Sequence, residues 1–250
     1  DGVRVLSSYD PEGPAQQTWP GQVRMESGAC IRNALVGVLC GEGDPANPGY
    51  VNSTPGTYGG VIETTDAVFE NNRFDVVAKQ WVSNTGTPSS SLIPEPCQAR
   101  IRLVNTTFRT TAPLLNAGLH PVAHLRVADN QPFVHGCTFA NELPAHTSSL
   151  EMGHGIDALN ANLRVEPCLS GPCLAGSDQG NTFRNLDHAI HAVATEGAPF
   201  STIRENTFTD NICGLYLKDL PGFDVRGRFG QDPRAGGLRP VVCAEEEEAP

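Results

Sequence analysis

Residues 152–160, with the sequence MGHGIDALN, hold the side chains of this chain that could most directly perform chemistry. His154 lies between two glycines, and Asp157 follows three residues later. Acid–base hydrolysis of a glycosidic bond needs a carboxylic acid and a base or nucleophile at a defined separation. His154 and Asp157 are therefore the candidate catalytic residues.

A second pair, His188 and His191, shows the same spacing as His154 and Asp157, thirty-four residues further along the chain. Histidine and carboxylate side chains are common ligands of zinc and similar ions. These four residues form a candidate metal site if the fold brings the two segments side by side. Whether it does so depends on the elements that carry them.

Those elements belong to an irregular repeat, in which the strings VNTTF, GCTF, GNTF and ENTF recur. The phenylalanine that ends each string is taken as the anchor of its copy, and aligning the residues that follow adds two more copies. The six anchors are Ile31, Phe69, Phe108, Phe139, Phe183 and Phe208. Five copies align without a gap, which puts Leu115 seven residues after Phe108, whereas the copy at Phe139 needs about ten extra residues before Gly155. Seven and nine residues after the anchor the side chains are apolar, which indicates a strand with one buried face.

The anchors are separated by 38, 39, 31, 44 and 25 residues, which is less regular than a propeller blade or a leucine-rich repeat. A coil with tolerant loops fits better, so we predict an all-β fold, a right-handed parallel β-helix (solenoid) with irregular loop insertions. Each rung would stack on the previous one at about 4.8 Å. We expect an incomplete first rung or N-terminal cap at 1–28, the β-helix at 29–230, and a C-terminal cap or flexible acidic tail at 231–250.

Stacked rungs would bring equal positions of neighbouring copies together. His154 would then lie about 5 Å from His188, and Asp157 about 5 Å from His191. Residues three apart on an extended segment tend to point in opposite directions, so a single site with all four ligands is awkward. The alternative is a cross-rung pair of Asp157 and His191 beside a surface pair of stacked histidines.

The position two residues after the anchor is polar in every copy and carries an amide or carboxylate in five of the six: Asn33, Asn71, Asn141, Asn185 and Asp210. Stacked amides can hydrogen-bond along a ladder at the strand spacing, and asparagine tolerates the left-handed conformation of sharp turns. We therefore predict a turn with an asparagine ladder at this position. The phenylalanine anchors predict an internal aromatic stack.

The composition excludes several partners. The net charge is −11 with 17 lysines and arginines, so there is no basic stripe and nucleic acid is not an expected partner. No apolar run approaches the roughly 20 residues that cross a bilayer, so we expect no membrane insertion. No motif points to a cofactor, and we expect none.

The cysteines indicate an oxidising location. Eight cysteines are an even number and many for a cytosolic protein, so we expect export. Cys168 and Cys173 lie five residues apart in the loop PCLSGPCLAG and are a candidate disulfide, with two free thiols as the alternative. Because no Cys-x-x-Cys occurs, a cysteine zinc site is less expected, and the other pairings stay open.

The rungs GNTFRNLDHAIHA and ENTFTDNICGLYLKD resemble those of right-handed parallel β-helix surface proteins in the pectin-lyase-like superfamily. The stretch YGGVIETTDAVFENNRFDVVAK is similar to large exported Bacteroidota-type proteins that often carry a type-nine secretion sorting domain. This resemblance covers roughly residues 19–229. It implies an extracellular or bacterial cell-surface location and a segment of a longer chain, but no defined biochemical role.

Three functions are suggested by these patterns: a polysaccharide-degrading enzyme, a metal site and a noncatalytic module. Polygalacturonases carry an active-site histidine in a Gly-His-Gly, but their Asn-Thr-Asp and Asp-Asp motifs are missing before His154, and their Arg-Ile-Lys after it. We therefore expect a noncatalytic extracellular structural or adhesive module whose loops could bind glycan or protein. A glycoside hydrolase or lyase is the alternative.

Overall fold

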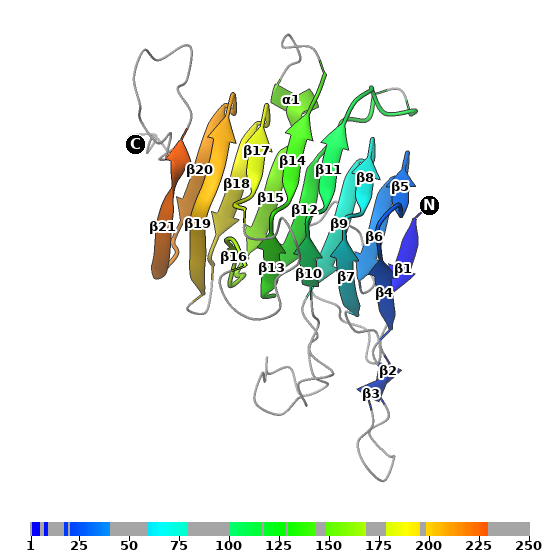
Figure 1. Ribbon diagram of the computed structural model, residues 1–250, viewed down its shortest axis with the longest axis horizontal. Helices are drawn as coiled ribbons and strands as arrows, with labels where there is room; N and C mark the ends of the chain where they lie inside the picture. Colours follow the sequence, from blue (N-terminus) through cyan, green and yellow to red (C-terminus); the bar gives the residue numbers. More distant parts are fainter. Residues whose placement is uncertain are drawn as a thin grey trace.

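Two long sheets of parallel strands dominate the computed structural model (Figure 1). Within the described residues the chain is all-β apart from one short helix, α1 (Ser149–Met152). The structure describes residues 2–5, 8–9, 18–19, 21–40, 60–79, 101–116, 118–128, 130–143, 149–168, 179–195 and 199–229.

The first sheet has seven strands, each from a different part of the chain. Their order is β1 (Val3–Val5), β6 (Val36–Cys40), β9 (Phe74–Lys79), β12 (Ala123–Ala128), β15 (His154–Leu159), β18 (His188–Val193) and β20 (Cys213–Lys218). Neighbouring strands are parallel. The chain therefore leaves the sheet after each strand and begins the next strand at the same end of the sheet as the one before.

The second sheet consists of two ladders that meet in one long strand, β19 (Phe200–Thr209). One ladder is β4 (Gln22–Met25), β7 (Val61–Thr65), β10 (Ile101–Val104), β13 (Pro132–His135) and β16 (Arg164–Val165). The other is β5 (Cys30–Arg32), β8 (Val68–Glu70), β11 (Thr107–Thr110), β14 (Thr138–Asn141) and β17 (Thr182–Arg184). β21 (Gly222–Phe229) pairs with β19, and β2 (Ser8–Tyr9) forms a separate antiparallel pair with β3 (Thr18–Trp19).

Along the chain the strands recur in threes, one from each ladder and one from the first sheet, and we call such a triplet a rung. The triplet β7–β8–β9 is followed by β10–β11–β12 and then by β13–β14–β15. Each strand pairs with its counterpart in the next rung. This arrangement is all-β and parallel and is compatible with a β-helix.

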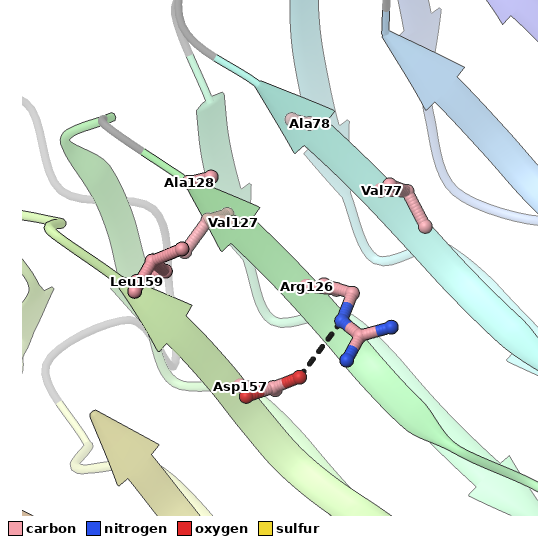
Figure 2. A pocket seen from close by; sticks show the side chains of 7 residues that line it. All are labelled: Val77, Ala78, Arg126, Val127, Ala128, Asp157 and Leu159. Atoms are coloured by element: carbon pink, nitrogen blue, oxygen red, sulfur yellow. Dashed lines mark hydrogen bonds and ion pairs between the residues drawn. The ribbon is translucent and has the colours of Figure 1, made fainter. Parts of the chain in front are cut away.

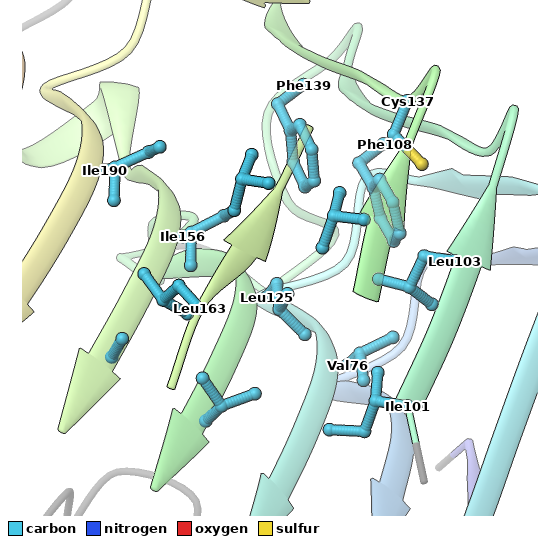
Figure 3. Close-up of a cluster of buried hydrophobic side chains, with 14 of the residues drawn as sticks. Val76, Ile101, Leu103, Phe108, Leu125, Cys137, Phe139, Ile156, Leu163 and Ile190 are labelled. Atoms are coloured by element: carbon cyan, nitrogen blue, oxygen red, sulfur yellow. The ribbon is translucent and has the colours of Figure 1, made fainter. Parts of the chain in front are cut away.

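The backbone register confirms the anchor alignment, because Ile31, Phe69, Phe108, Phe139, Phe183 and Phe208 pair in succession. The five aromatic rings stack with centroids 4.8 to 5.2 Å apart and planes within 13° of parallel. Figure 3 shows Phe108 and Phe139 above the apolar residues of the opposite strands, including Leu125 and Ile156. The predicted internal aromatic stack is therefore confirmed.

One copy of the alignment is wrong. The residue that pairs with Val76 and Ile156 is Leu125, whereas Leu115 is 78% exposed. Leu125 follows its anchor by 17 residues (125 − 108), as Ile156 does (156 − 139), instead of seven. Two neighbouring rungs thus carry insertions at the same corner, residues 111–122 and 142–153. The apolar pair at 114–115 imitates a strand in sequence, but only 123–128 forms backbone pairs with both neighbours.

The predicted polar slot is a left-handed turn where no insertion follows. Asn33, Asn71, Asn185 and Asp210 have φ of 55–58°, whereas Asn141 ends β14 because an insertion comes next. Three of these amides, Asn71, Asn141 and Asn185, bond to backbone groups and not to the next amide of the predicted ladder. Asn71 accepts from the backbone N–H groups of Thr111 and Ala112, and Asn185 donates to the Asn141 carbonyl. A left-handed turn directs the side chain toward the neighbouring backbone.

Cross-rung amide bonds occur instead two residues before the anchor, at a position that the sequence pattern did not single out. Asn181 and Asn206 are fully buried, and Asn206 Oδ1 accepts from Asn181 Nδ2 at 2.8 Å and from its backbone N–H at 3.0 Å. Asn181 Oδ1 accepts in turn from the Cys137 backbone N–H at 2.8 Å. The Asn-Thr-Phe that the strings GNTF and ENTF share is the sequence signal that could have predicted these cross-rung amide bonds.

A second buried amide position lies three residues after the anchor. Asn72 Oδ1 accepts from the Ala34 backbone N–H at 2.7 Å, and its Nδ2 donates to the Ile31 carbonyl at 3.0 Å. Asn211 makes the same two bonds to Leu186 and Phe183. These amides satisfy backbone groups that the strand ends of the preceding rung leave open.

The predicted segment 231–250 lies outside the described residues. The predicted first segment, 1–28, contains β1 to β4, and β4 stacks on β7 as the first member of its ladder. None of the helices among the described residues is long and apolar enough to span a membrane.

The aromatic stack predicts a large loss of stability when one ring is removed from its middle. We expect Phe139→Ala to lower the free energy of unfolding by about 3–5 kcal/mol, because it leaves a cavity between two stacked rings. Chemical denaturation measures this change. The exposed Leu115→Ala is the control, with a change within about 0.5 kcal/mol. Equal effects of the two substitutions would contradict the stack.

The left-handed turns predict a difference between two substitutions at one exposed corner. We expect Asn33→Ala to cost about 1 kcal/mol, because a Cβ-bearing residue without a polar side chain disfavours positive φ. Asn33→Gly should be neutral within about 0.5 kcal/mol, since glycine adopts this conformation freely. Thermal and chemical unfolding of both variants distinguish the two cases. A loss in the glycine variant as large as in the alanine variant would mean that the side chain, not the backbone angle, matters there.

Candidate functional site

The candidate residues lie on two adjacent parallel strands, β15 and β18. His154 pairs with His188, and Asp157 pairs with His191, as the alignment predicts. The rings of His154 and His188 have their centroids 5.0 Å apart. The fold therefore brings the four sequence candidates side by side, across one step between rungs.

His154 and His191 also lie on the same face, with ring centroids 5.5 Å apart. The expectation that residues three apart point in opposite directions is wrong here, because Gly155 and Ile156 are both buried and alternation stops between them. The register of every neighbouring pair in this sheet omits the Gly155 position. A Cβ on Gly155 would meet the Ala189 carbonyl oxygen at 2.5 Å, so this close approach requires glycine.

Asp157 is held from two neighbouring rungs. Its Oδ1 lies 2.9 Å from His191 Nδ1, and its Oδ2 accepts a hydrogen bond from Arg126 Nε at 2.8 Å. Burial raises the pKa of the Asp157 carboxyl, but the hydrogen bond to His191 and the charge of Arg126 outweigh it, so the pKa lies below its ordinary value. Figure 2 shows the Arg126–Asp157 pair, which lines the outer surface of β9, β12 and β15 together with Val77 and Leu159. The hollow between these side chains measures about 10 Å³.

Asp187 is a member of the site that the sequence pattern did not reveal. Its Oδ2 lies 3.0 Å from His188 Nδ1, and the pKa of its carboxyl is lowered because this hydrogen bond and the nearby imidazoles outweigh the effect of burial. One ligand atom from each of His154, Asp187 and His188 lies within 4.8 Å of the others. This group contains two of the four candidate ligands, His154 and His188, and adds Asp187.

His154 is the least satisfied side chain of this cluster. Its Nδ1 is buried and has no hydrogen-bond partner. The pKa of His154 is lowered to about 4, mainly by burial and also by the neighbouring histidines, although the charges of Asp157 and Asp187 oppose the shift. The imidazole is therefore neutral at pH 7, with a nitrogen lone pair available.

The histidines continue into an aromatic row on the outer face of the first sheet. Tyr216, one rung further on, stacks on His191 with centroids 4.9 Å apart and meets His188 edge-on at 5.8 Å. We call His154, His188, His191, Asp157 and Asp187 the histidine cluster. Its charge and aromatic surface suit a metal ion or a polar ligand better than an apolar one.

The two carboxyl groups of the cluster do not match the proton donor that glycan hydrolysis needs. A catalytic acid is a carboxyl group whose pKa is raised, so that it is protonated near neutral pH. Both carboxyl groups of the cluster, Asp157 and Asp187, have lowered pKa values. His154, with a pKa of about 4, is not a proton donor near neutral pH either.

A carboxyl group whose pKa is raised, Asp75, lies inside the fold. Its Oδ2 is 2.6 Å from His124 Nδ1, and its Oδ1 accepts from Asn72 Nδ2 at 2.8 Å. Asp75 is 1% exposed and His124 4% exposed, and the imidazole packs beside Phe108 and Phe139. Burial raises the pKa of Asp75, although His124 and Asn72 oppose the shift. Since a substrate cannot reach this pair, it is structural.

The described cysteines are of two kinds. Cys168 and Cys213 are each disulfide-bonded, whereas Cys30, Cys40 and Cys137 are free thiols. Burial raises the pKa of Cys40 and of Cys137 to about 12, so both thiols are inert. Cys173 lies outside the described residues, and the Cys168–Cys173 bond stays a prediction.

No protein-family model, no curated protein and no solved structure matches this chain. The resemblance to pectin-lyase-like surface proteins therefore stays a prediction.

The buried pair predicts a stability effect that an exposed pair does not share. We expect Asp75→Ala to lower the free energy of unfolding by about 3–5 kcal/mol, because His124 and Asn72 then lose their buried partner. The control is Glu26→Ala, which removes the exposed ion pair with Arg24 and should cost no more than about 1 kcal/mol. Urea denaturation of both variants gives the comparison. If Asp75→Ala cost no more than the control, the pair would have no structural role.

Proposed function

We propose that this chain is a noncatalytic structural and adhesive module, built as a right-handed parallel β-helix of the pectin-lyase-like type within a longer exported bacterial protein. One observation carries the proposal: the strands of successive rungs pair in unbroken register from β6 to β20. Such a stack is stiff, because each inner strand is hydrogen-bonded on both sides and its inner face is filled.

The interior supports a scaffold rather than a binding cavity. The stacked phenylalanine rings and the apolar side chains opposite them fill the space between the sheets, as Figure 3 shows for its central part. Ligand pockets for small molecules usually measure about 300–1,000 Å³. The hollows at the Arg126–Asp157 pair and beside Arg73 measure about 10 Å³ and 120 Å³.

The two insertions support contact with a partner. They follow β11 and β14 at the same corner of neighbouring rungs, and Figure 1 shows α1, in the second insertion, beyond the tip of β14. The larger hollow lies between the first insertion and the corner turns, where Leu35 is 43% and Leu115 78% exposed. An exposed apolar surface beside a polar corner suits weak binding of a protein or glycan surface.

The alternative is a glycan-degrading enzyme centred on His154. The lowered pKa values of Asp157 and Asp187 count against it, because neither carboxyl would donate a proton near neutral pH. Noncatalytic binding needs no such donor.

Assays with acidic and neutral polysaccharides test this function. We expect no new reducing ends and no unsaturated products above the level of heat-denatured protein. Sedimentation with insoluble polysaccharides would measure binding in the same samples. Release of products by the native chain, lost in His154→Ala but kept in His135→Ala, would overturn the noncatalytic assignment. His135 is the control because it lies on β13, in another ladder, and bonds to the Glu166 carbonyl.

A further inference from the structure

The start of β15 and the start of β18 bring together three side chains that no structural role requires in this combination. Across the sheet, the slot of His154 and His188 is occupied by Val36, Phe74, Ala123 and Cys213 in other rungs. The fold therefore does not demand a histidine at this slot. Two neighbouring histidines next to Asp187 form a group of metal-type ligands at this slot.

We propose that His154, Asp187 and His188 bind a divalent transition-metal ion of the zinc class between these two rungs. One ligand atom from each residue lies within 4.8 Å of the other two, and all three side chains are half-buried. Ligand atoms of a tetrahedral zinc ion are about 3.4 Å apart, given bonds of about 2.0–2.1 Å. Rotations of side chains that move each atom by about 1 Å would close the site around an ion.

The chemistry of the donors selects the kind of ion. Two imidazoles and one carboxylate are the ligand set of zinc and its neighbours, whereas calcium requires six to eight oxygens and magnesium an octahedron of oxygens. The three protein ligands leave one position of a tetrahedral ion open to water. The ring centroid of His191 lies 5.5 Å from those of His154 and His188.

The surroundings are already arranged for a cation. His154 Nδ1 is buried without a hydrogen-bond partner, so this nitrogen is available to a ligand. Asp157 and Asp187 bring two negative charges to the cluster, and Arg126 offsets one of them through its bond to Asp157. Asp157 also fixes the ring of His191 through its Nδ1, as carboxylates do for histidines beside metals.

This inference goes beyond the proposed function and stands without it. A bound ion would join β15 to β18 across the outer face, in addition to their backbone bonds. An adhesive module can carry such an ion as a link between rungs or as a contact for a carboxylate of a partner. Neither role requires catalysis.

Isothermal titration of the chelator-treated full chain with zinc tests the proposal, using protein without a histidine tag. We expect one equivalent to bind, and cobalt to bind at the same site with the intense visible absorption of tetrahedral coordination. Asp187→Asn and His188→Ala should each weaken zinc binding at least about 100-fold, since each removes a ligand. His135→Ala, which removes an imidazole from another ladder, should leave the affinity unchanged.

Two further results decide the matter. The variant His154→Ala/His188→Ala should bind no zinc while keeping the circular dichroism spectrum of the native chain. Zinc should raise the midpoint of thermal unfolding of the native chain and not that of this variant. Absence of zinc binding by the native chain, or a full equivalent bound by the folded double variant, would overturn the site. Loss of the fold in the double variant would leave Asp187→Asn, which keeps the size of the side chain, to decide.

Discussion

Hydrogen bonding between parallel strands in equal register is the constraint on which the rest of this structure depends. The inner strands of the first sheet, such as β12 and β15, are paired on both sides with the same slots of the neighbouring rungs. A slip by one residue would turn inward side chains outward, so the buried face fixes the register. Whatever occupies a slot in one rung therefore meets the same slot in the next, at the strand spacing.

The filling of the interior results from that constraint. Phenylalanines at the anchor slot stack because equal register places each ring above the next, and they do so over five rungs. Backbone groups at the corners lose their strand partners and still need hydrogen bonds inside the fold. The buried amides of Asn72, Asn181 and Asn206 supply them to the preceding rung. The buried Asp75–His124 pair shows that the slot after the corner also accepts polar groups when they satisfy each other.

The equal register of neighbouring strands also produces the histidine cluster on the outer face of the first sheet. Stacking brings His154 to His188 and Asp157 to His191, and Arg126 extends the network to a third rung. The break in alternation at Gly155 then turns two separate cross-rung pairs into one surface. A site of this kind needs no loop or cavity, because its residues are held by strands that already form the scaffold.

The sequence by itself determined the rung order, the anchor stack, the left-handed corners and the pairing of His154 with His188, because side-chain period and turn residues are local properties. It did not determine where β12 begins, since the apolar residues around Leu115 satisfy the same local pattern as those around Leu125. Nor did it reveal Asp187 as a neighbour of His154, or the shared face of His154 and His191. Only the tertiary structure decided these points, because insertion length and breaks in alternation depend on backbone contacts with other rungs, such as that of Gly155 with Ala189.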